Sequence, residues 1–147
     1  MRIGILCYPT YGGSGVVATE LGRHLARRGH TIHIISFDRP FRLTGAAGYE
    51  ENLYFHQVHM MGYAVLKTDC YTTAAAVKMA ELVREEGLEI LHSHYAVPHA
   101  VSAMLAKQMC NGSAVRLVTT IHGTDITLVG SNPAYAPAVQ MGLNQSD

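Results

Sequence analysis

Residues 7–18 are Cys-Tyr-Pro-Thr-Tyr-Gly-Gly-Ser-Gly-Val-Val-Ala, a glycine-rich stretch between an apolar run and an amphipathic run. The apolar residues at 3–6 indicate a buried strand before it. After it, Val17, Leu21 and Leu25 recur at helical spacing. The stretch therefore predicts a strand, a glycine turn and the start of a helix. Glycines let the backbone approach a bound group closely, and the N–H groups of a first helical turn attract negative charge. We expect an anion or a polyhydroxylated group to bind here.

The composition is that of a globular protein. The chain has 147 residues, of which 48% are hydrophobic and 15% are charged, so it can form one domain with a sizeable core. Eleven basic and eleven acidic residues give a net charge of zero, which argues against a nucleic-acid partner. No apolar run reaches membrane-spanning length, and residues 1–3 lead straight into the first strand without a signal peptide. We expect a cytoplasmic protein without a membrane span, with reduced cysteines and with Cys7 in the core.

Strands alternate with helices along the chain. The apolar and β-branched runs predict strands at 3–6, 31–36, 53–59, 89–95 and 115–122. Helical spacing and end signals predict helices at 14–28, with Ser14 as a possible N-cap, at 71–86, from Pro98 to 109, and from a cap at 131–133 to 145. Irregular connections are expected at 37–48 and 62–69. The alternation implies right-handed crossovers and a parallel sheet in the order 3-2-1-4-5, an α/β, doubly wound, Rossmann-like fold.

That strand order brings three polar clusters together. The carboxyl ends of the first and fourth strands lie side by side at the switch point where open α/β sheets bind ligands, with the fifth strand next to them. Residues 12–14, 92–95 and 119–125 follow or end these strands. We therefore expect the functional site at this edge of the sheet.

His122 is the candidate catalytic residue. It stands where the fifth predicted strand meets Gly123, close to Thr120 and Asp125. An imidazole at this place can hydrogen-bond a sugar hydroxyl or tune a reacting centre, and Asp125 can fix its tautomer. The alternative is a strand-end histidine that binds a loop carbonyl.

The other histidines are expected to be structural. His92 and His94 alternate along one strand and share a face, but no further ligand stands at a recognisable spacing. His33 lies within an apolar strand, where a satisfied hydrogen bond is the expected role. We therefore expect no metal site.

One alternative is a nicotinamide-dependent oxidoreductase. Residues 13–18 match the dinucleotide fingerprint with alanine in its third small position, and Asp38 follows about 20 residues later. Against this NAD(P)-binding interpretation, residues 8–12 lengthen the loop between the strand and the first glycine of the match.

Three motifs in order carry a family resemblance: residues 8–15, residues 92–99 (His-Ser-His-Tyr-Ala-Val-Pro-His) and residues 119–125 (Thr-Thr-Ile-His-Gly-Thr-Asp). With them the chain resembles, over essentially its whole length, the amino-terminal domain of retaining GT-B glycosyltransferases of family 4. More narrowly, the chain resembles members of this family that transfer GlcNAc from UDP-GlcNAc to the hydroxyl of L-malate without a metal or other cofactor. It implies that residues 1–147 are the acceptor-side domain and that a carboxyl-terminal nucleotide-sugar domain is absent from this chain, so we expect a fragment. It also implies a possible homodimer.

Position and resemblance together assign the substrate-binding residues. Gly12 and Gly13 are expected to let the backbone approach the donor diphosphate and sugar. Ser14 and the helix N-terminus are expected to bind a malate carboxylate. Tyr95 and Thr120 are expected to complete the acceptor pocket.

Asp125 is expected beside the substrate, and His122 in contact with the transferred sugar. The acceptor stays open, because related enzymes on this scaffold glycosylate inositol phosphate, lipids and sugars. A further alternative is a stand-alone binding module that keeps the fold without catalysis.

Overall fold

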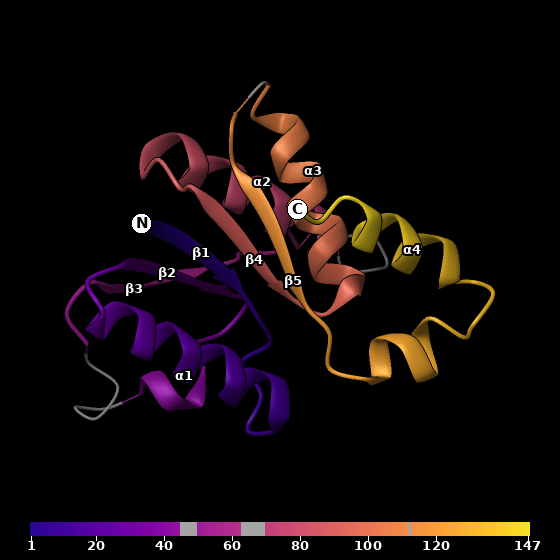
Figure 1. Ribbon diagram of the computed structural model, residues 1–147, viewed down its shortest axis with the longest axis horizontal. Helices are drawn as coiled ribbons and strands as arrows, with labels where there is room; N and C mark the ends of the chain where they lie inside the picture. The colour runs from indigo at the N-terminus through magenta and orange to yellow at the C-terminus, as the bar shows by residue number, and fades with distance from the viewer. Residues whose placement is uncertain (45–49, 63–69, 112) are drawn as a thin grey trace.

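The protein forms a five-stranded parallel sheet with helices on both faces (Figure 1). The computed structural model describes residues 1–44, 50–62, 70–111 and 113–147, so most of the predicted connection at 62–69 and residues 45–48 of the one at 37–48 lie outside it. The strand order β3-β2-β1-β4-β5 confirms the predicted order. The strands are β1 (Arg2–Leu6), β2 (Thr31–Ser36), β3 (Leu53–Gln57), β4 (Ile90–His94) and β5 (Arg116–Thr120).

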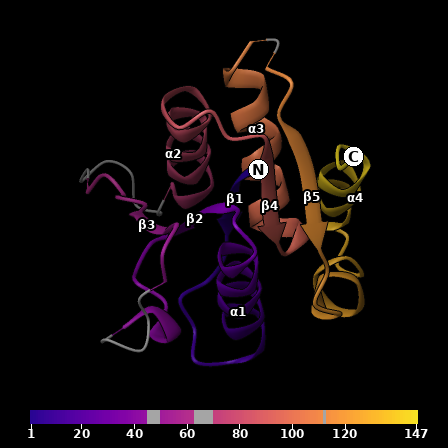
Figure 2. The same cartoon turned by 60° about the vertical axis from the view of Figure 1, so that its left-hand side comes forward.

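Within the described residues, four helices and three short helical segments lie between the strands or after β5. The helices are α1 (Gly13–Arg27), α2 (Tyr71–Glu85), α3 (Val101–Met109) and α4 (Ala136–Asn144). The short segments are η1 (Phe41–Leu43), η3 (Ala96–Ala100) and η4 (Asp125–Val129). Helix α1 covers one face of the sheet, and α2 and α3 pack side by side on the other (Figure 2). Helix α4 packs against η3 and α3 near the β5 edge.

Alternation along the strands divides the core into two layers. Ile3 and Ile5 of β1 point toward α1, whereas Leu6 belongs to the layer under α2 and α3. Cys7 is buried in the core on the α1 side, as predicted. Burial raises the pKa of its thiol to about 12, so the thiol stays protonated. No helix in the described ranges combines the length and the apolar character that crossing a membrane requires.

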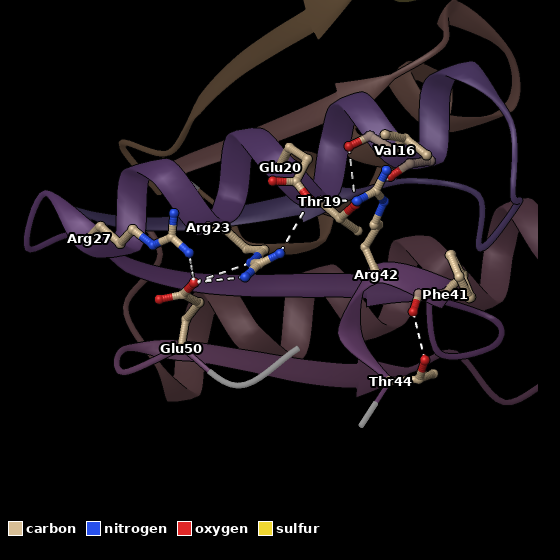
Figure 3. Close-up of polar contacts among 10 residues, drawn as sticks. Val16, Thr19, Glu20, Arg23, Arg27, Phe41, Arg42, Thr44 and Glu50 are labelled. Carbon is tan, nitrogen blue, oxygen red and sulfur yellow. Dashed lines mark hydrogen bonds and ion pairs between the residues drawn. The ribbon is translucent and has the colours of Figure 1, made fainter. Parts of the chain in front are cut away.

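A charged network ties α1 to the segment before β3. The Glu50 carboxylate accepts hydrogen bonds from Arg23, at 3.1 Å from Nη2, and from Arg27 (Figure 3). Glu20 forms an ion pair with Arg23 at 3.3 Å and lies 3.9 Å from the guanidinium of Arg42 in η1. These contacts link α1 to η1 and to the segment before β3.

Two predicted helix starts are wrong. Gly12, not Ser14, is the N-cap of α1, and no side chain caps this end. By contrast, helical dihedral angles begin at Pro98 as predicted, after the extended Val97 (φ −122°, ψ 130°), and the regular α-helix α3 continues them from Val101. Helix α4 begins at Ala136, after a turn at 131–135, and η4 was not predicted. Its sequence, residues 125–129, lacks the length over which helical periodicity can be recognised.

Candidate functional site

The three polar clusters meet at one edge of the sheet, as predicted. Strand β4 lies between β1 and β5, and Ser93 is in register with both Leu6 and Thr119. The chain therefore leaves all three strands at the same level, and the segments that follow them lie side by side.

The glycines of the first loop differ in their surroundings. A Cβ atom on Gly15 would lie 2.7 Å from the carbonyl oxygens of Tyr8 and Thr10, so this glycine allows the helix start to pack on the loop. A Cβ atom on Gly12 or Gly13 would have no atom within 4 Å. The protein itself thus gives no packing reason for these two glycines, and they border open space that a ligand can enter.

The first turn of α1 faces that space with no negative charge of its own. It contains no acidic residue, and Ser14 lies in it, 7% exposed. The N–H groups at the start of a helix carry partial positive charge and bind anions. This end of α1 can therefore bind a carboxylate or a phosphate.

His122 is paired with a buried histidine. Its Nε2 lies 3.0 Å from Nδ1 of His94, and its ring centroid lies 4.8 Å from that of Tyr95. His94 is fully buried, and burial, followed by the charges of the neighbouring histidines, lowers its pKa to about 3. His94 is therefore neutral at physiological pH.

Thr120 is also held by a histidine. Its hydroxyl lies 2.7 Å from Nε2 of His92, and burial together with His122 lowers the pKa of His92. The rings of His92 and His94 lie 4.8 Å apart, on one face of β4 as predicted. The hydrogen bond to His92 holds the Thr120 side chain in place at the end of β5.

Asp125 binds backbone rather than the His122 imidazole. Its carboxylate accepts the N–H groups of Ala96 and of His122, each at 2.7 Å, and the residue is only 2% exposed. The expected contact that fixes the His122 tautomer is not formed, because the short aspartate side chain reaches back to the main chain of its own turn. Asp125 instead joins the segment after β4 to the segment after β5.

Tyr95 has a left-handed backbone at the centre of the site. Its φ is 89°, a region that residues with a Cβ atom rarely adopt. The backbone is held by hydrogen bonds from Tyr95 N–H to the Thr120 carbonyl at 3.0 Å and from Ala100 N–H to the Tyr95 carbonyl at 3.1 Å. The Tyr95 ring packs against Tyr8 at 5.7 Å between centroids. Such outliers persist where the surrounding structure fixes them, often at functional sites.

A network behind the site was not predicted. His99 is fully buried, and its Nδ1 donates to the His94 carbonyl. Its Nε2 must then accept, so the Tyr71 hydroxyl donates to it at 3.1 Å. Burial lowers the pKa of His99 to about 4 and raises that of Tyr71. The sequence holds no local signal for this contact, because Tyr71 opens α2 and lies 28 residues from His99.

Neither a metal cluster nor cavity size marks the site. Within the described part of the chain, no three His, Cys, Asp or Glu side chains are grouped so that they can hold a metal ion. A cavity of about 550 Å³ lies at the opposite end of the strands, lined by residues such as Glu89, Ala114 and Arg116. The polar clusters of the candidate site lie at the other end, so we assign the site by its chemistry.

Known proteins with similar sequences are glycosyltransferases. The profile of Glycosyltransferase Family 4 matches residues 11–147. The chain is 52% identical over its whole length to N-acetyl-alpha-D-glucosaminyl L-malate synthase of Bacillus anthracis, of which it spans 38%.

Solved structures of low sequence identity share the fold. Sucrose-phosphate synthase from Thermosynechococcus elongatus matches with a TM-score of 0.62 and 12% identity, covering 100% of this chain and 41% of that one. MurG from Acinetobacter baumannii matches with a TM-score of 0.60 and 6% identity, covering 99% and 39%. These likenesses concern the fold alone. The family match, however, covers the glycine loop from residue 11 and both later motifs, and replaces the dinucleotide-binding alternative: the chain belongs to glycosyltransferase family 4.

Proposed function

We propose that this chain is the acceptor-side domain of an enzyme that transfers GlcNAc from UDP-GlcNAc to the hydroxyl of L-malate with retention, the first step of bacillithiol biosynthesis. The observation that carries the proposal is the 52% identity, over the whole chain, to a synthase named for this product. The remaining part of such an enzyme supplies most of the nucleotide site. The transfer needs no metal or other cofactor.

The acceptor binds at the start of α1. Ser14 and the N–H groups of the first helical turn bind one malate carboxylate, which the absence of acidic residues in that turn favours. Tyr95 and Thr120 complete the pocket from the ends of β4 and β5. The hydrogen bond between His92 Nε2 and the Thr120 hydroxyl, 2.7 Å long, supports this role because it holds the Thr120 side chain in place.

The donor lies over the glycine loop. Gly12 and Gly13 let the backbone approach the diphosphate and sugar, in keeping with the open space beside both positions. His122 hydrogen-bonds the transferred sugar. Asp125 lies beside the substrate and holds the backbone of His122 at 2.7 Å.

The reaction is an attack on the same face as the departing group. The malate hydroxyl oxygen forms a bond to the anomeric carbon as the bond from that carbon to the diphosphate breaks, through an oxocarbenium-like state. UDP leaves with the electron pair, and its phosphate oxygen takes the hydroxyl proton. The residues described here bind and orient the two substrates, which is how positioning lowers a barrier.

Coupled UDP release from UDP-GlcNAc tests the proposal, using the complete reading frame of the gene beside the 147-residue chain. We expect L-malate-dependent release from the complete protein only. Succinate, which lacks the hydroxyl, should give no release. A folded complete protein that releases UDP with inositol phosphate but not with malate would identify another small anion as the acceptor.

His122→Ala tests the catalytic assignment in the same assay. We expect UDP release to fall about tenfold or more, since a positioned hydrogen bond at the reacting sugar is lost. His24→Ala is the control, because His24 is an exposed histidine in the last turn of α1. Equal rates in the two variants would rule out the role of His122.

A further inference from the structure

The pairing of His94 with His122 limits where their protons can be. Nδ1 of His94 and Nε2 of His122 lie 3.0 Å apart, so one of these nitrogens carries a proton and the other accepts it. Within the described part of the chain, Nδ1 of His122 has no hydrogen-bond partner in the protein. The direction of this one hydrogen bond therefore decides what His122 offers to a ligand.

Burial of His94 favours one direction. Its Nε2 is buried and has no partner among the described residues. If His122 donated to His94, a neutral His94 would carry its proton on Nε2, leaving a buried N–H group without an acceptor. If His94 donates through Nδ1, only an unprotonated ring nitrogen stays unpartnered. Orphaned buried N–H groups are the rarer and costlier of the two.

The surrounding contacts hold His94 in place for this bond. His99 donates from Nδ1 to the His94 carbonyl, and the Tyr71 hydroxyl fixes the His99 tautomer at 3.1 Å. His94 is also in register with Thr120 on β5. The donor is thus fixed by β4, β5 and α2 together.

We propose that His94 is a positioning residue, whose Nδ1–H donates to Nε2 of His122 and so leaves the proton of the neutral His122 ring on Nδ1, as a donor to the substrate. The identity of the ligand, a hydroxyl of the transferred sugar, rests on the proposed function. The tautomer of His122 follows from the contacts of His94 and does not depend on that function. Without His94, His122 can carry its proton on either nitrogen, and part of the population then offers a lone pair where a donor is needed.

Nitrogen-15 NMR of the complete, histidine-labelled protein tests the tautomer, since the shift of each ring nitrogen shows whether it carries a proton. His122→Gln identifies the signals of His122. In the unmodified protein we expect a proton on Nδ1 and none on Nε2. A proton on Nε2 would overturn the proposal, whatever the variants do.

Variants of His94 test the consequence for catalysis. His94→Leu removes the donor, whereas His94→Asn keeps an N–H group near the position of Nδ1. We expect His94→Leu to mix the two tautomers of His122 and to lower kcat about tenfold with little change in KM for malate. We expect His94→Asn to restore the Nδ1–H form and kcat to within about threefold.

His33→Leu is the matched control. His33 is also a buried strand histidine, 2% exposed, with Nδ1 2.9 Å from another histidine and Nε2 unpartnered among the described residues. It lies on β2, away from the site, so its loss should change neither the His122 tautomer nor kcat. Equal effects of His33→Leu and His94→Leu on kcat would contradict the proposal. If the complete protein releases no UDP with malate, the proposed acceptor fails, while the NMR spectrum still decides the tautomer.

Discussion

Replacing Asp125 should loosen the two segments that carry Tyr95 and His122. Its buried carboxylate accepts the N–H groups of Ala96 and His122, each at 2.7 Å. A hydrogen bond to a charged acceptor contributes about 1.5–3 kcal/mol. Asp125→Ala removes two such bonds, so we expect the local free energy of opening to fall by about 3–6 kcal/mol in all. Loss of one of these hydrogen bonds should speed hydrogen exchange at the amide that made it by about 10- to 150-fold, because 1.36 kcal/mol corresponds to a factor of ten.

Hydrogen exchange followed by mass spectrometry on the complete protein measures this, in peptides that cover residues 94–100 and 121–127. Asp125→Asn should have an intermediate effect, because its amide oxygen can accept one N–H group while its NH₂ group faces the other. Asp38→Ala is the control. Its carboxylate also accepts a backbone N–H group, that of Arg39 at 2.8 Å, but in an exposed loop. Exchange at Ala96 and His122 that rises less than threefold in Asp125→Ala would refute the bridging role.

Three further predictions concern the glycine loop, the buried histidines and the metal. Gly15→Ala should destabilise the protein by about 1–3 kcal/mol in thermal melts, because its Cβ atom would lie 2.7 Å from two carbonyl oxygens. Gly13→Ala should leave the stability within about 0.5 kcal/mol but raise the KM measured by UDP release, because a Cβ atom there meets only open space. Burial lowers the pKa of His94 to about 3 and that of His99 to about 4, below the ordinary value for histidine of about 6.5. The unfolded chain therefore binds protons first, and stability should fall as pH drops from about 6.5 to about 3. Urea midpoints that stay constant over this range would contradict their neutral burial. UDP release by the complete protein should be unchanged in EDTA, and a loss that Mg²⁺ or Mn²⁺ restores would show that the transfer needs a metal.

The amino-acid sequence was sufficient to predict the sheet and the edge at which the site lies. Apolar runs separated by helical periodicity specify strands and helices locally, and the handedness of crossovers then leaves few strand orders. Glycines and polar residues placed after the strands indicated the three segments that meet there. The same local signals failed at residues 125–129, where a short helical segment leaves no periodic pattern.

Which residues gather at this edge follows from the amino-acid sequence alone, because strand order and strand ends depend on patterns that each segment carries. What those residues do to one another depends on how the folded chain packs. The contacts of His94 with His122 and of Tyr71 with His99 join residues 28 positions apart, and Asp125 reaches Ala96 across 29. The direction and burial of such contacts depend on how helices and strands pack. For the same physical reason, Gly13 and Gly15 look alike in the sequence, yet one borders open space and the other touches two carbonyl oxygens.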